Sequence, residues 1–424
     1  SGEARTMLSR TVAVARPGLR HRSASLWAKV AAAPPDAILG LVEEFKKDPR
    51  PQKVSLSAGT YRTDEGKPWV LPSVKLAEER IVAANLDKEY LGIAGMAGFT
   101  SRAREFAMGD DCSAIKEGRV ASVQTLSGTG ACRLIGEFYA QHLGKGTPLY
   151  LPKPSWGNHA KIFAAAGLEV RYYRYWDPKT LGLDCAGMIE DLKAAPDGSA
   201  VLLHACAHNP TGVDPTEGQW RDIASALKGR ELALFFDSAY QGFASGNAEA
   251  DAFSIRHFEK EGISFALGQS FAKNFGLYGE RVGVLSMICA DPDEAQRIES
   301  QLKQLIRPMY SSPPLSGARI VETVLSDPAL CAQWRGECKT MADRIISMRA
   351  ALKASLEKTG STRNWDHVTA QIGMFCYSGL SPEQVDLLKS EYAVYITRDG
   401  RISMAGVTTG NVDYVASSIH AVSK

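Results

Sequence analysis

The sequence predicts an α/β fold in which helices flank a mostly parallel sheet, with a smaller α+β domain towards the C-terminus. Two observations lead to this fold class. Between about residues 37 and 320, short runs of β-forming residues alternate with longer stretches of helical apolar spacing, and this alternation is typical of parallel sheets. One run, residues 232–236, is continuously apolar, as expected of a strand that is buried on both faces.

The elements are predicted in chain order. Residues 37–45 have apolar side chains at helical spacing and are followed by two lysines, which favour the last turn of a helix. Strands are predicted at 121–126, 147–151, 168–175, 199–204, 232–236, 264–267 and 282–288, with helices at 131–143 and 158–166. Beyond residue 320 we expect helices at 331–358, 382–392 and 412–422 and strands at 374–377 and 393–397.

The change of pattern near residue 320 predicts two domains. We expect residues 67–324 to form the large domain and residues 325–424 the small one. Residues 23–66 are expected to form an N-terminal arm and part of the small domain.

The first 35 residues differ in charge from the rest of the chain. They hold six basic residues and one acidic residue, and residues 7–35 contain no acid. Serine and alanine between arginines are typical of a mitochondrial or plastid transit peptide, and a merely basic, disordered terminus is the alternative. We expect residues 1–22 to be this leader, with residues 1–6 a cloning remnant and a mature chain beginning near residues 23–27. The predicted location is the mitochondrial matrix, with a plastid as the other possibility.

Composition argues against several other classes of protein. The formal net charge of +2 over 424 residues is too balanced for a nucleic-acid-binding protein. The sequence contains no run of eighteen apolar residues, so no transmembrane helix is predicted. The eight cysteines form no C-x-x-C pair, which argues against zinc ribbons and disulfide frameworks, and no metal site is predicted.

Polar residues that follow the predicted strands are the candidates for a site, because open α/β sheets bind ligands at the carboxyl ends of their strands. Ser127-Gly128-Thr129-Gly130 follows one strand and opens a helix. Its amides, hydroxyls and helix dipole would favour a phosphate, although an ordinary helix N-terminus has the same residues. Residues 208–212 are turn-forming, and Asn209 among them could donate into the same crevice.

Asp237 and Lys273 follow two further strands. A carboxylate inside an apolar sheet needs a cation or a donor, but Asp237 could also simply cap a helix; Tyr240 follows it. A lysine at this edge can lose its proton by desolvation and attack aldehydes, whereas most lysines are only solvated. A phosphate cup, a buried carboxylate, an asparagine, a tyrosine and a lysine together suit pyridoxal phosphate.

Longer motifs carry a resemblance from about residue 33 to the end of the chain. They include P-P-D-A-I-L-G-L at 34–41, G-T-Y-R-T-D-E-G-K-P-W-V-L-P at 59–72, L-S-G-T-G at 126–130, H-N-P-T-G at 208–212, D-S-A-Y-Q-G-F-A-S-G at 237–246, S-F-A-K-N-F-G-L-Y at 270–278, R-P-M-Y-S-S-P-P at 307–314 and G-R-I-S at 400–403. With these motifs the chain resembles the class I pyridoxal-phosphate aminotransferases, and within them the aspartate aminotransferases of the mitochondrial type. The resemblance implies the fold-type-I transferase fold and a homodimer with shared active sites. It also implies reversible ping-pong transfer of the amino group from L-aspartate to 2-oxoglutarate, giving oxaloacetate and L-glutamate.

The resemblance implies a role for each matching residue. Lys273 would bind pyridoxal 5′-phosphate covalently and then carry protons, and Asp237 would pair with the pyridine nitrogen. The ring would be contacted by Trp156, Asn209 and Tyr240, of which the first two would also lie against the substrate. The phosphate would be held by Ser127, Gly128, Thr129, Ser270, Arg281 and Tyr90 of the partner subunit. The two substrate carboxylates would be held by Arg401, with Gly59 closing over it, and by Arg307 of the partner subunit.

The chain departs from the family pattern at a few positions. Ala272 replaces a common serine, so one hydroxyl near the phosphate is missing. The pair Ser57-Ala58 replaces a common Gly-Val and could alter closure over the substrate. The remaining departures are Gly92 for proline, Gly279 for asparagine and Ser403 for asparagine.

Two alternatives remain open at this point. One is an aromatic or broad-specificity aminotransferase of the same family, because such enzymes can keep Arg307 and move it aside. The other is a non-catalytic binding protein on the same scaffold, against which Lys273 and Asp237 argue. Turnover of aspartate compared with phenylalanine would distinguish the first, and the absence of a cofactor absorption band would favour the second.

Overall fold

The computed structural model describes residues 25–34, 36 and 38–424 of the chain. Residues 37–424 form one compact unit, and the few described residues before them belong to another. The predicted leader, residues 1–22, lies outside the described residues. The first predicted helix is present as α1 (Leu39–Lys47). No helix in the described part of the chain is long and apolar enough to cross a membrane.

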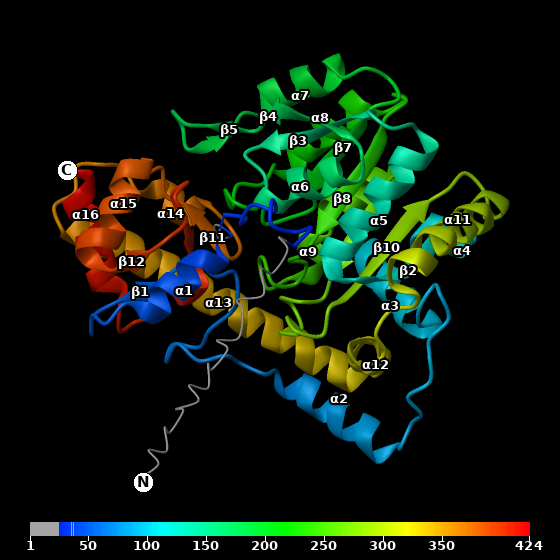
Figure 1. Cartoon of the computed structure of the whole chain (residues 1–424), viewed down its shortest axis with the longest axis horizontal. Helices are drawn as coiled ribbons and strands as arrows, with labels where there is room; N and C mark the ends of the chain where they lie inside the picture. The colour runs from blue at the N-terminus through cyan, green and yellow to red at the C-terminus, as the bar shows by residue number, and fades with distance from the viewer. Residues whose placement is uncertain (1–24, 35, 37) are drawn as a thin grey trace, which may run out of the picture. The chain divides into compact units, whose positions relative to one another are not determined.

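A seven-stranded sheet forms the centre of the compact unit (Figure 1). In spatial order its strands are β2 (Val120–Leu126), β10 (Val282–Ile288), β9 (Ala266–Ser270), β8 (Ala233–Ser238), β7 (Ala200–His204), β3 (Pro148–Lys153) and β4 (Glu169–Arg174). Strand β10 runs antiparallel to both of its neighbours, and the other paired strands are parallel. The predicted α/β class with a mostly parallel sheet is therefore confirmed.

Helices bury both faces of the sheet. Because successive side chains of a strand point to opposite faces, Phe235 of β8 lies in the core under α5 (Ser127–His142), α6 (Gly157–Ala165) and α11 (Pro292–Tyr310). Phe236 lies in the opposite core with α7 (Cys185–Ala194), α8 (Glu217–Leu227) and α10 (Phe253–Lys260). Both rings are fully buried. The apolar run at 232–236 was therefore correctly interpreted as a strand covered on two sides.

Several elements were not predicted from the sequence. They include α2 (Pro72–Ala83), α3 (Ala97–Met108), α12 (Ser316–Ser326), the short helices α4 (Ser113–Lys116) and α9 (Ala248–Asp251), and the hairpin of β5 (Trp176–Asp177) and β6 (Gly182–Leu183). Helices α7, α8, α10 and α11 were also missed. Helix α2 buries only Ser73, Val74 and Ala77, so its apolar spacing is weak in the sequence.

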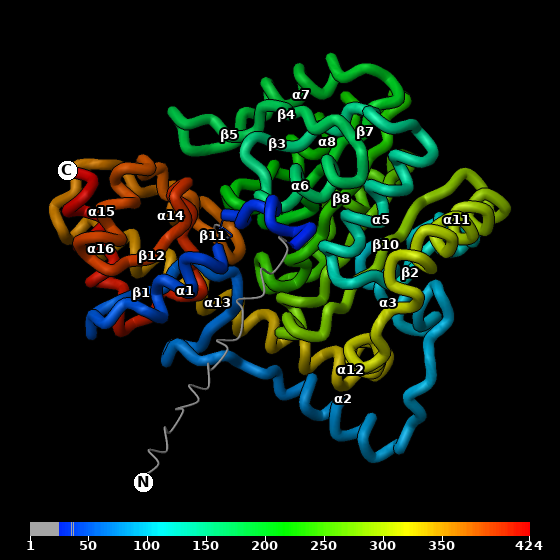
Figure 2. The backbone as a smooth tube through the Cα atoms, viewed as in Figure 1, coloured from blue at the N-terminus to red at the C-terminus, as the bar shows by residue number. Residues whose placement is uncertain are grey.

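The C-terminal elements gather beside the long helix α13 (Pro328–Lys358), which connects them to the sheet side of the unit (Figure 2). They are α14 (Asp366–Ala370), β11 (Phe375–Tyr377), α15 (Pro382–Tyr392), β12 (Val394–Tyr395), β13 (Arg401–Ser403), the 3-10 turn at Met404–Gly406 and α16 (Val412–Ser423). Strand β1 (Val54–Ser55) pairs in parallel with β12. The predicted strand at 393–397 is thus only two residues long, because Ala393 ends α15 in a left-handed conformation with φ 52°.

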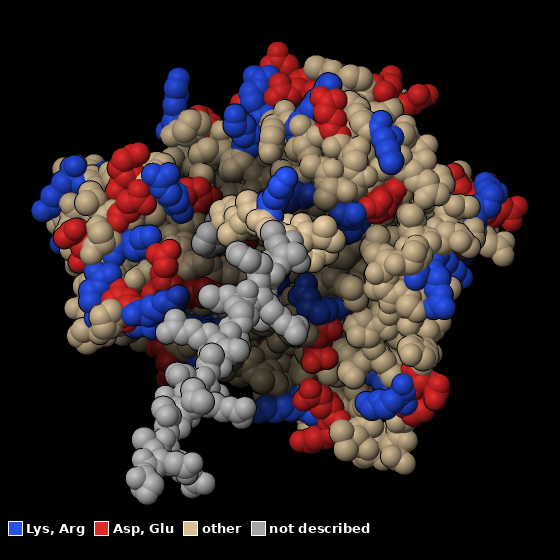
Figure 3. Space-filling model, in the orientation of Figure 1, with Lys and Arg blue, Asp and Glu red and all other residues tan. Residues whose placement is uncertain are grey.

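Charged side chains of both signs are interspersed on the face shown in Figure 3. This mixture agrees with the balanced composition, and it gives this face no large patch of one sign that would attract a polyanion.

Candidate active site

A cavity of about 230 Å³ lies at the carboxyl ends of the parallel strands. Residues that follow β2, β3, β7, β8 and β9 line it, together with residues from β11, β13 and the loop at Gly59. Twelve of the fourteen predicted site residues line this one cavity: Gly59, Ser127, Gly128, Thr129, Trp156, Asn209, Asp237, Tyr240, Ser270, Lys273, Arg281 and Arg401. The structure therefore brings these twelve residues together around one cavity.

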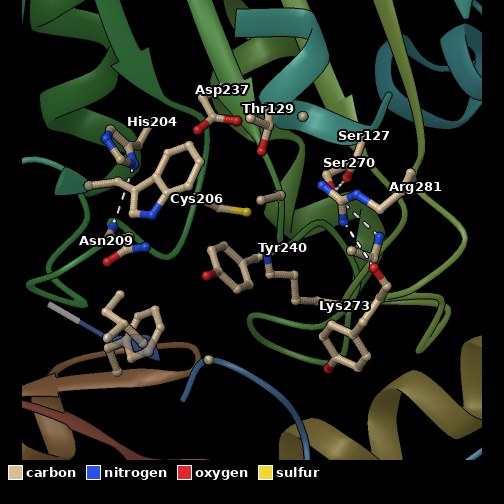
Figure 4. Close-up of a pocket in the computed structure, with 18 of the residues that line it drawn as sticks. Ser127, Thr129, His204, Cys206, Asn209, Asp237, Tyr240, Ser270, Lys273 and Arg281 are labelled. Carbon is tan, nitrogen blue, oxygen red and sulfur yellow. Dashed lines mark hydrogen bonds between the residues drawn. The ribbon is translucent and has the colours of Figure 1, made fainter. Parts of the chain in front are cut away.

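A group of donors occupies one side of the cavity (Figure 4). The hydroxyls of Ser127 and Ser270 lie 2.9 Å apart, at the start of α5 and the end of β9. Ser127 and Arg281 both adopt left-handed conformations, with φ 61° and 55°, and such strained positions concentrate at functional sites. Arg281 forms no salt bridge among the described residues. Together with the N-terminus of α5, this group forms a cationic cup suited to a phosphate.

Close packing around Gly128 explains why the residue at this position has no side chain. A Cβ atom at this position would lie 3.2 Å from Cβ of Ser270 and 3.8 Å from Oδ1 of Asp237. A larger side chain would therefore crowd both the cup and the carboxylate. Gly128 allows the helix N-terminus to approach the cavity.

Asp237 presents a carboxylate on the opposite side of the cavity from the C-terminal elements. It lies inside β8, and the next helix begins only at Ala248, so the helix-cap explanation does not apply. Nε2 of His159 lies 3.0 Å from Oδ2 of Asp237. Burial raises the pKa of Asp237, but the hydrogen bond from His159, with the electrostatic influence of the neighbouring basic side chains, outweighs burial and leaves the pKa below its ordinary value. The group is therefore a carboxylate at neutral pH.

Three residues behind Asp237 extend this polar network, and the sequence did not indicate them. Oγ of Ser155 lies 2.9 Å from Nδ1 of His159 and 3.4 Å from Nε2 of His204. Burial lowers the pKa of His204 to about 3, helped by the neighbouring His159, so His204 is neutral. One signal was available: His159 follows Trp156 by three residues at the start of α6, which places both on one face of the helix.

Cys132, His159 and Asp237 could together offer three ligand atoms to a metal ion. Burial, followed by the nearby charge of Asp237, raises the pKa of the Cys132 thiol well above its ordinary value. A protonated thiol is a poor metal ligand, and His159 already uses one nitrogen on Asp237. The trio is therefore better suited to orienting a carboxylate towards a protonated ring nitrogen.

Lys273 and Tyr240 extend into the cavity between the donor group and the Asn209 side (Figure 4). Nζ of Lys273 lies 5.3 Å from the centre of the Tyr240 ring. Burial lowers the pKa of Lys273. The charge of Asp237 raises this pKa, and the charges of Arg281 and Arg401 lower it, so that the net pKa lies below its ordinary value. Burial raises the pKa of the Tyr240 phenol. Burial thus shifts both groups towards their neutral forms.

Arg401 supplies a second cationic group from β13. Its Nη2 donates to the carbonyl oxygen of Ser57 at 3.0 Å, and its Nη1 donates to Oδ1 of Asn209 at 3.3 Å. The guanidinium lies 4.1 Å above the Phe375 ring. Its Nε is buried without a hydrogen-bond partner, and no described carboxylate forms a salt bridge with it. A buried guanidinium that lines a cavity and has no carboxylate partner suits a ligand carboxylate.

Tyr90 and Arg307 do not line the cavity of their own chain. Tyr90 is 91% exposed in the loop after α2. Arg307 lies near the end of α11 and donates to Oγ of Ser311. The roles of these two residues across a subunit boundary therefore remain predictions.

The arrangement fits pyridoxal 5′-phosphate on its donor chemistry. An anion cup, an ionised carboxylate and a lysine with a lowered pKa occupy separate parts of one cavity. A phosphate, a pyridine nitrogen and an aldehyde are the groups these three would bind. The residues present thus match the phosphate, the ring nitrogen and the aldehyde of the cofactor.

The chain belongs to the family of class I and II aminotransferases, whose family model matches residues 51–419. Enzymes of this family use pyridoxal phosphate, and a structural neighbour carries it covalently bound. The protein is therefore a pyridoxal-phosphate-dependent aminotransferase with the fold-type-I fold.

Individual aminotransferases are similar to nearly the whole chain. The chain is 54% identical over 406 residues to the mitochondrial aspartate aminotransferase of Xenopus tropicalis, covering 96% of this chain and 95% of that protein. It resembles the structure of a mitochondrial aspartate aminotransferase from Trypanosoma brucei, with a TM-score of 0.88 and 45% identity over 91% of this chain and 100% of that one. It also resembles an aromatic-amino-acid aminotransferase from Burkholderia pseudomallei, with a TM-score of 0.91 and 44% identity over 94% of this chain and 100% of that one.

Proposed function

We propose that the enzyme is an aspartate transaminase that transfers the amino group of L-aspartate to 2-oxoglutarate in a reversible ping-pong reaction. The observation that carries the aminotransferase chemistry is the single cavity lined by Lys273, Asp237 and Arg401, and the choice of aspartate rests on the relatives. The mitochondrial aspartate aminotransferases among the relatives support the same substrate. An assay with aspartate and 2-oxoglutarate should detect oxaloacetate and glutamate, and failure to form both would contradict the proposal.

The residues of the chain divide the chemistry among them. When bound, pyridoxal phosphate supplies an aldehyde for the substrate amine and a ring that accepts electron density. Lys273, whose pKa is lowered by burial, would attack as a neutral amine and later accept the Cα proton of the substrate. Asp237, which is held ionised, would keep a proton on the ring nitrogen. The Tyr240 phenol would donate to the ring oxygen, and Trp156 and Asn209 would fix the ring between them.

The second substrate carboxylate requires a cation that the cavity of one chain lacks. We propose that the protein is a homodimer in which Arg307 and Tyr90 complete the neighbouring site. The exposed apolar side chains of Leu76, Val82 and Leu86, on α2 and the loop after it, support a contact there. Arg307 forms no salt bridge among the described residues, so its charge is available to a ligand.

Replacing Arg307 by alanine tests this arrangement. We expect kcat/KM for aspartate to fall roughly a hundredfold, because a charge-assisted bidentate contact in a partly dry site is worth about 3 kcal/mol. The value of kcat/KM for phenylalanine should fall less, because phenylalanine lacks the distal carboxylate.

A mixing experiment shows whether Arg307 acts in its own subunit or in the neighbouring one. In hybrids of Lys273→Ala and Arg307→Ala subunits, one site has both defects and the other has both residues intact. After random exchange, about a quarter of the sites should recover full aspartate activity. If exchange is demonstrated and activity does not return, Arg307 does not act across a dimer.

The missing hydroxyl at Ala272 makes a prediction specific to this chain. Ala272 is buried, lines the cavity, and its backbone N–H donates to Oγ of Ser270 at 3.4 Å. Ala272→Ser should tighten pyridoxal phosphate binding about fivefold, because one added hydrogen bond contributes about 1 kcal/mol. Equilibrium dialysis of the cofactor would measure this, and unchanged or weaker binding would show that position 272 does not contact the phosphate.

An aromatic or broad-specificity transaminase is the second candidate function, favoured by the similarity to the Burkholderia enzyme. The two candidates differ in the ratio of kcat/KM for aspartate and phenylalanine. We expect aspartate to be preferred, and a preference for phenylalanine would select the second candidate.

Two further proposals concern organisation and location. We propose that residues 325–424, joined by residues 38–66 through the β1–β12 pair, form a small domain that brings Arg401 to the edge of the large domain at 67–324. We also propose import into the mitochondrial matrix, supported by the basic leader composition and by the mitochondrial relatives.

A further inference from the structure

Arg349 is a buried cation without a carboxylate partner. It lies on α13, is only 2% exposed, and forms no salt bridge with any described residue. Its Nη1 donates to the carbonyl oxygen of Val368 at 2.9 Å. Its Nη2 donates to that of Gly373 at 2.9 Å and to that of Phe375. Burying a charge is costly unless polar groups compensate it; here three backbone carbonyls accept from Nη1 and Nη2, while Nε is buried without a hydrogen-bond partner.

Two of the three carbonyls held by Arg349, those of Gly373 and Phe375, belong to a short segment, residues 372–375, that touches both sides of the cavity. The N–H of Ile372 donates to the carbonyl oxygen of Gly212 at 2.7 Å, in the turn that carries Asn209. The N–H of Met404 donates to the carbonyl oxygen of Met374 at 2.9 Å, just beyond β13. This segment is therefore held between the Asn209 turn and the strand that carries Arg401.

The contacts of this segment leave little room for movement. A Cβ atom on Gly212 would lie 2.6 Å from the carbonyl oxygen of Phe375. A Cβ atom on Gly59 would lie 2.9 Å from Cζ of the Phe375 ring. The backbone and the ring of Phe375 are thus each in close contact with a glycine, and a small shift of residue 375 would be transmitted to the cavity wall.

Phe375 in turn supports Arg401. Its ring lies 4.1 Å below the Arg401 guanidinium, and the register pairs Phe375 with Ser403 and Tyr377 with Arg401. The position of the ring therefore sets the height at which the Arg401 guanidinium faces the cavity.

We propose that Arg349 is a positioning residue for substrate-carboxylate recognition, acting through Phe375 to hold Arg401 in place. This inference rests on the proposed role of Arg401. Arginine suits the task because its planar fork can serve several carbonyls at fixed angles, which a lysine ammonium on a flexible stem does not.

The test uses holoenzyme and succinate, a dicarboxylate without an amino group to transfer. Isothermal titration would compare wild type with Arg349→Lys and Arg349→Met. We expect the dissociation constant for succinate to rise about tenfold for Lys and more for Met, within the range of coupling through a shared contact. The visible absorption band of the bound cofactor should be unchanged.

Arg344→Lys is the matched control. Arg344 lies on the same helix and also donates to backbone carbonyls, those of Ala405 and Val407. Its replacement should lower the melting temperature without changing the affinity for succinate. An equal loss of affinity in this control would contradict the proposal, because any loosening of α13 would then suffice.

A double-mutant cycle identifies the route. Phe375→Leu alone should weaken succinate binding, and adding Arg349→Lys should weaken it little further, because both changes disturb the same support.

Additive effects, or unchanged affinity in both Arg349 variants, would contradict the proposal. Loss of folding or of cofactor in both would also contradict it, because Arg349 would then be required for the fold rather than for ligand geometry. Failure of wild type to bind succinate would instead contradict the proposed function.

Discussion

Replacing Lys273 by alanine is expected to lower the rate of transamination at least about ten-thousand-fold, since the side chain would serve as both cofactor anchor and proton carrier. The change removes the only lysine that lines the described cavity. Cofactor should still bind through the cup at Ser127, Ser270 and Arg281. Steady-state turnover of aspartate would measure the loss.

Two further variants test whether the loss of activity is due to the amine of Lys273. Lys273→Arg keeps a positive charge but cannot release a proton near neutral pH, so it should be as inactive as the alanine variant. Lys339→Ala removes an exposed lysine that pairs with Asp343 on α13 and should leave turnover unchanged. Activity of Lys273→Ala within tenfold of wild type would remove Lys273 from the mechanism.

Replacing Asp237 by alanine is expected to slow Cα-proton abstraction by about three orders of magnitude, or about 4 kcal/mol of activation free energy. Without the carboxylate, nothing described in the cavity would hold a proton on the ring nitrogen. Because the native pKa of Asp237 lies below its ordinary value, the carboxylate form persists down to acidic pH. Wild-type activity should therefore show no loss from this group as the pH falls from 7 to 5.

The rate of the half-reaction with aspartate, followed in a stopped-flow spectrophotometer, would measure the Asp237 effect. Asp197→Ala, which removes an exposed carboxylate paired with Arg230, is the control for general charge effects. If Asp237→Ala loses stability but keeps its half-reaction rate, Asp237 serves the fold and not the chemistry.

The sequence predicted the residues that line the cavity better than the residues that hold them in position. Most of the cup, carboxylate and lysine residues lie at or just beyond the carboxyl end of a strand. Parallel strands deliver their carboxyl ends to one edge, so residues as far apart as Ser127 and Lys273 could be placed together. His159, Ser155 and Phe375 were missed because their roles depend on contacts across the fold. For example, His159 lies on α6 and reaches Asp237 on β8 only after the helix packs against the sheet.

The helices and strands also differ in how well the sequence predicted them. Strands with continuous apolar runs, such as β8, were found because burial on two faces leaves a signal in the sequence. The direction of β10 could not be predicted, since its apolar residues are compatible with either direction of pairing. Helix α2 was missed because its few buried residues make no strong apolar stripe, and Leu76 and Val82 remain 39% and 79% exposed within their own chain.

The central claim is that Lys273, Asp237 and Arg401 together make a cofactor-dependent aspartate transaminase. The most direct test is the visible absorption spectrum of the purified holoenzyme before and after aspartate is added, without a keto acid. We expect the band of the lysine-bound cofactor to be replaced by the shorter-wavelength band of its aminated form, and 2-oxoglutarate to restore the first band. A purified protein with no cofactor band, or a band that aspartate does not change, would contradict the claim.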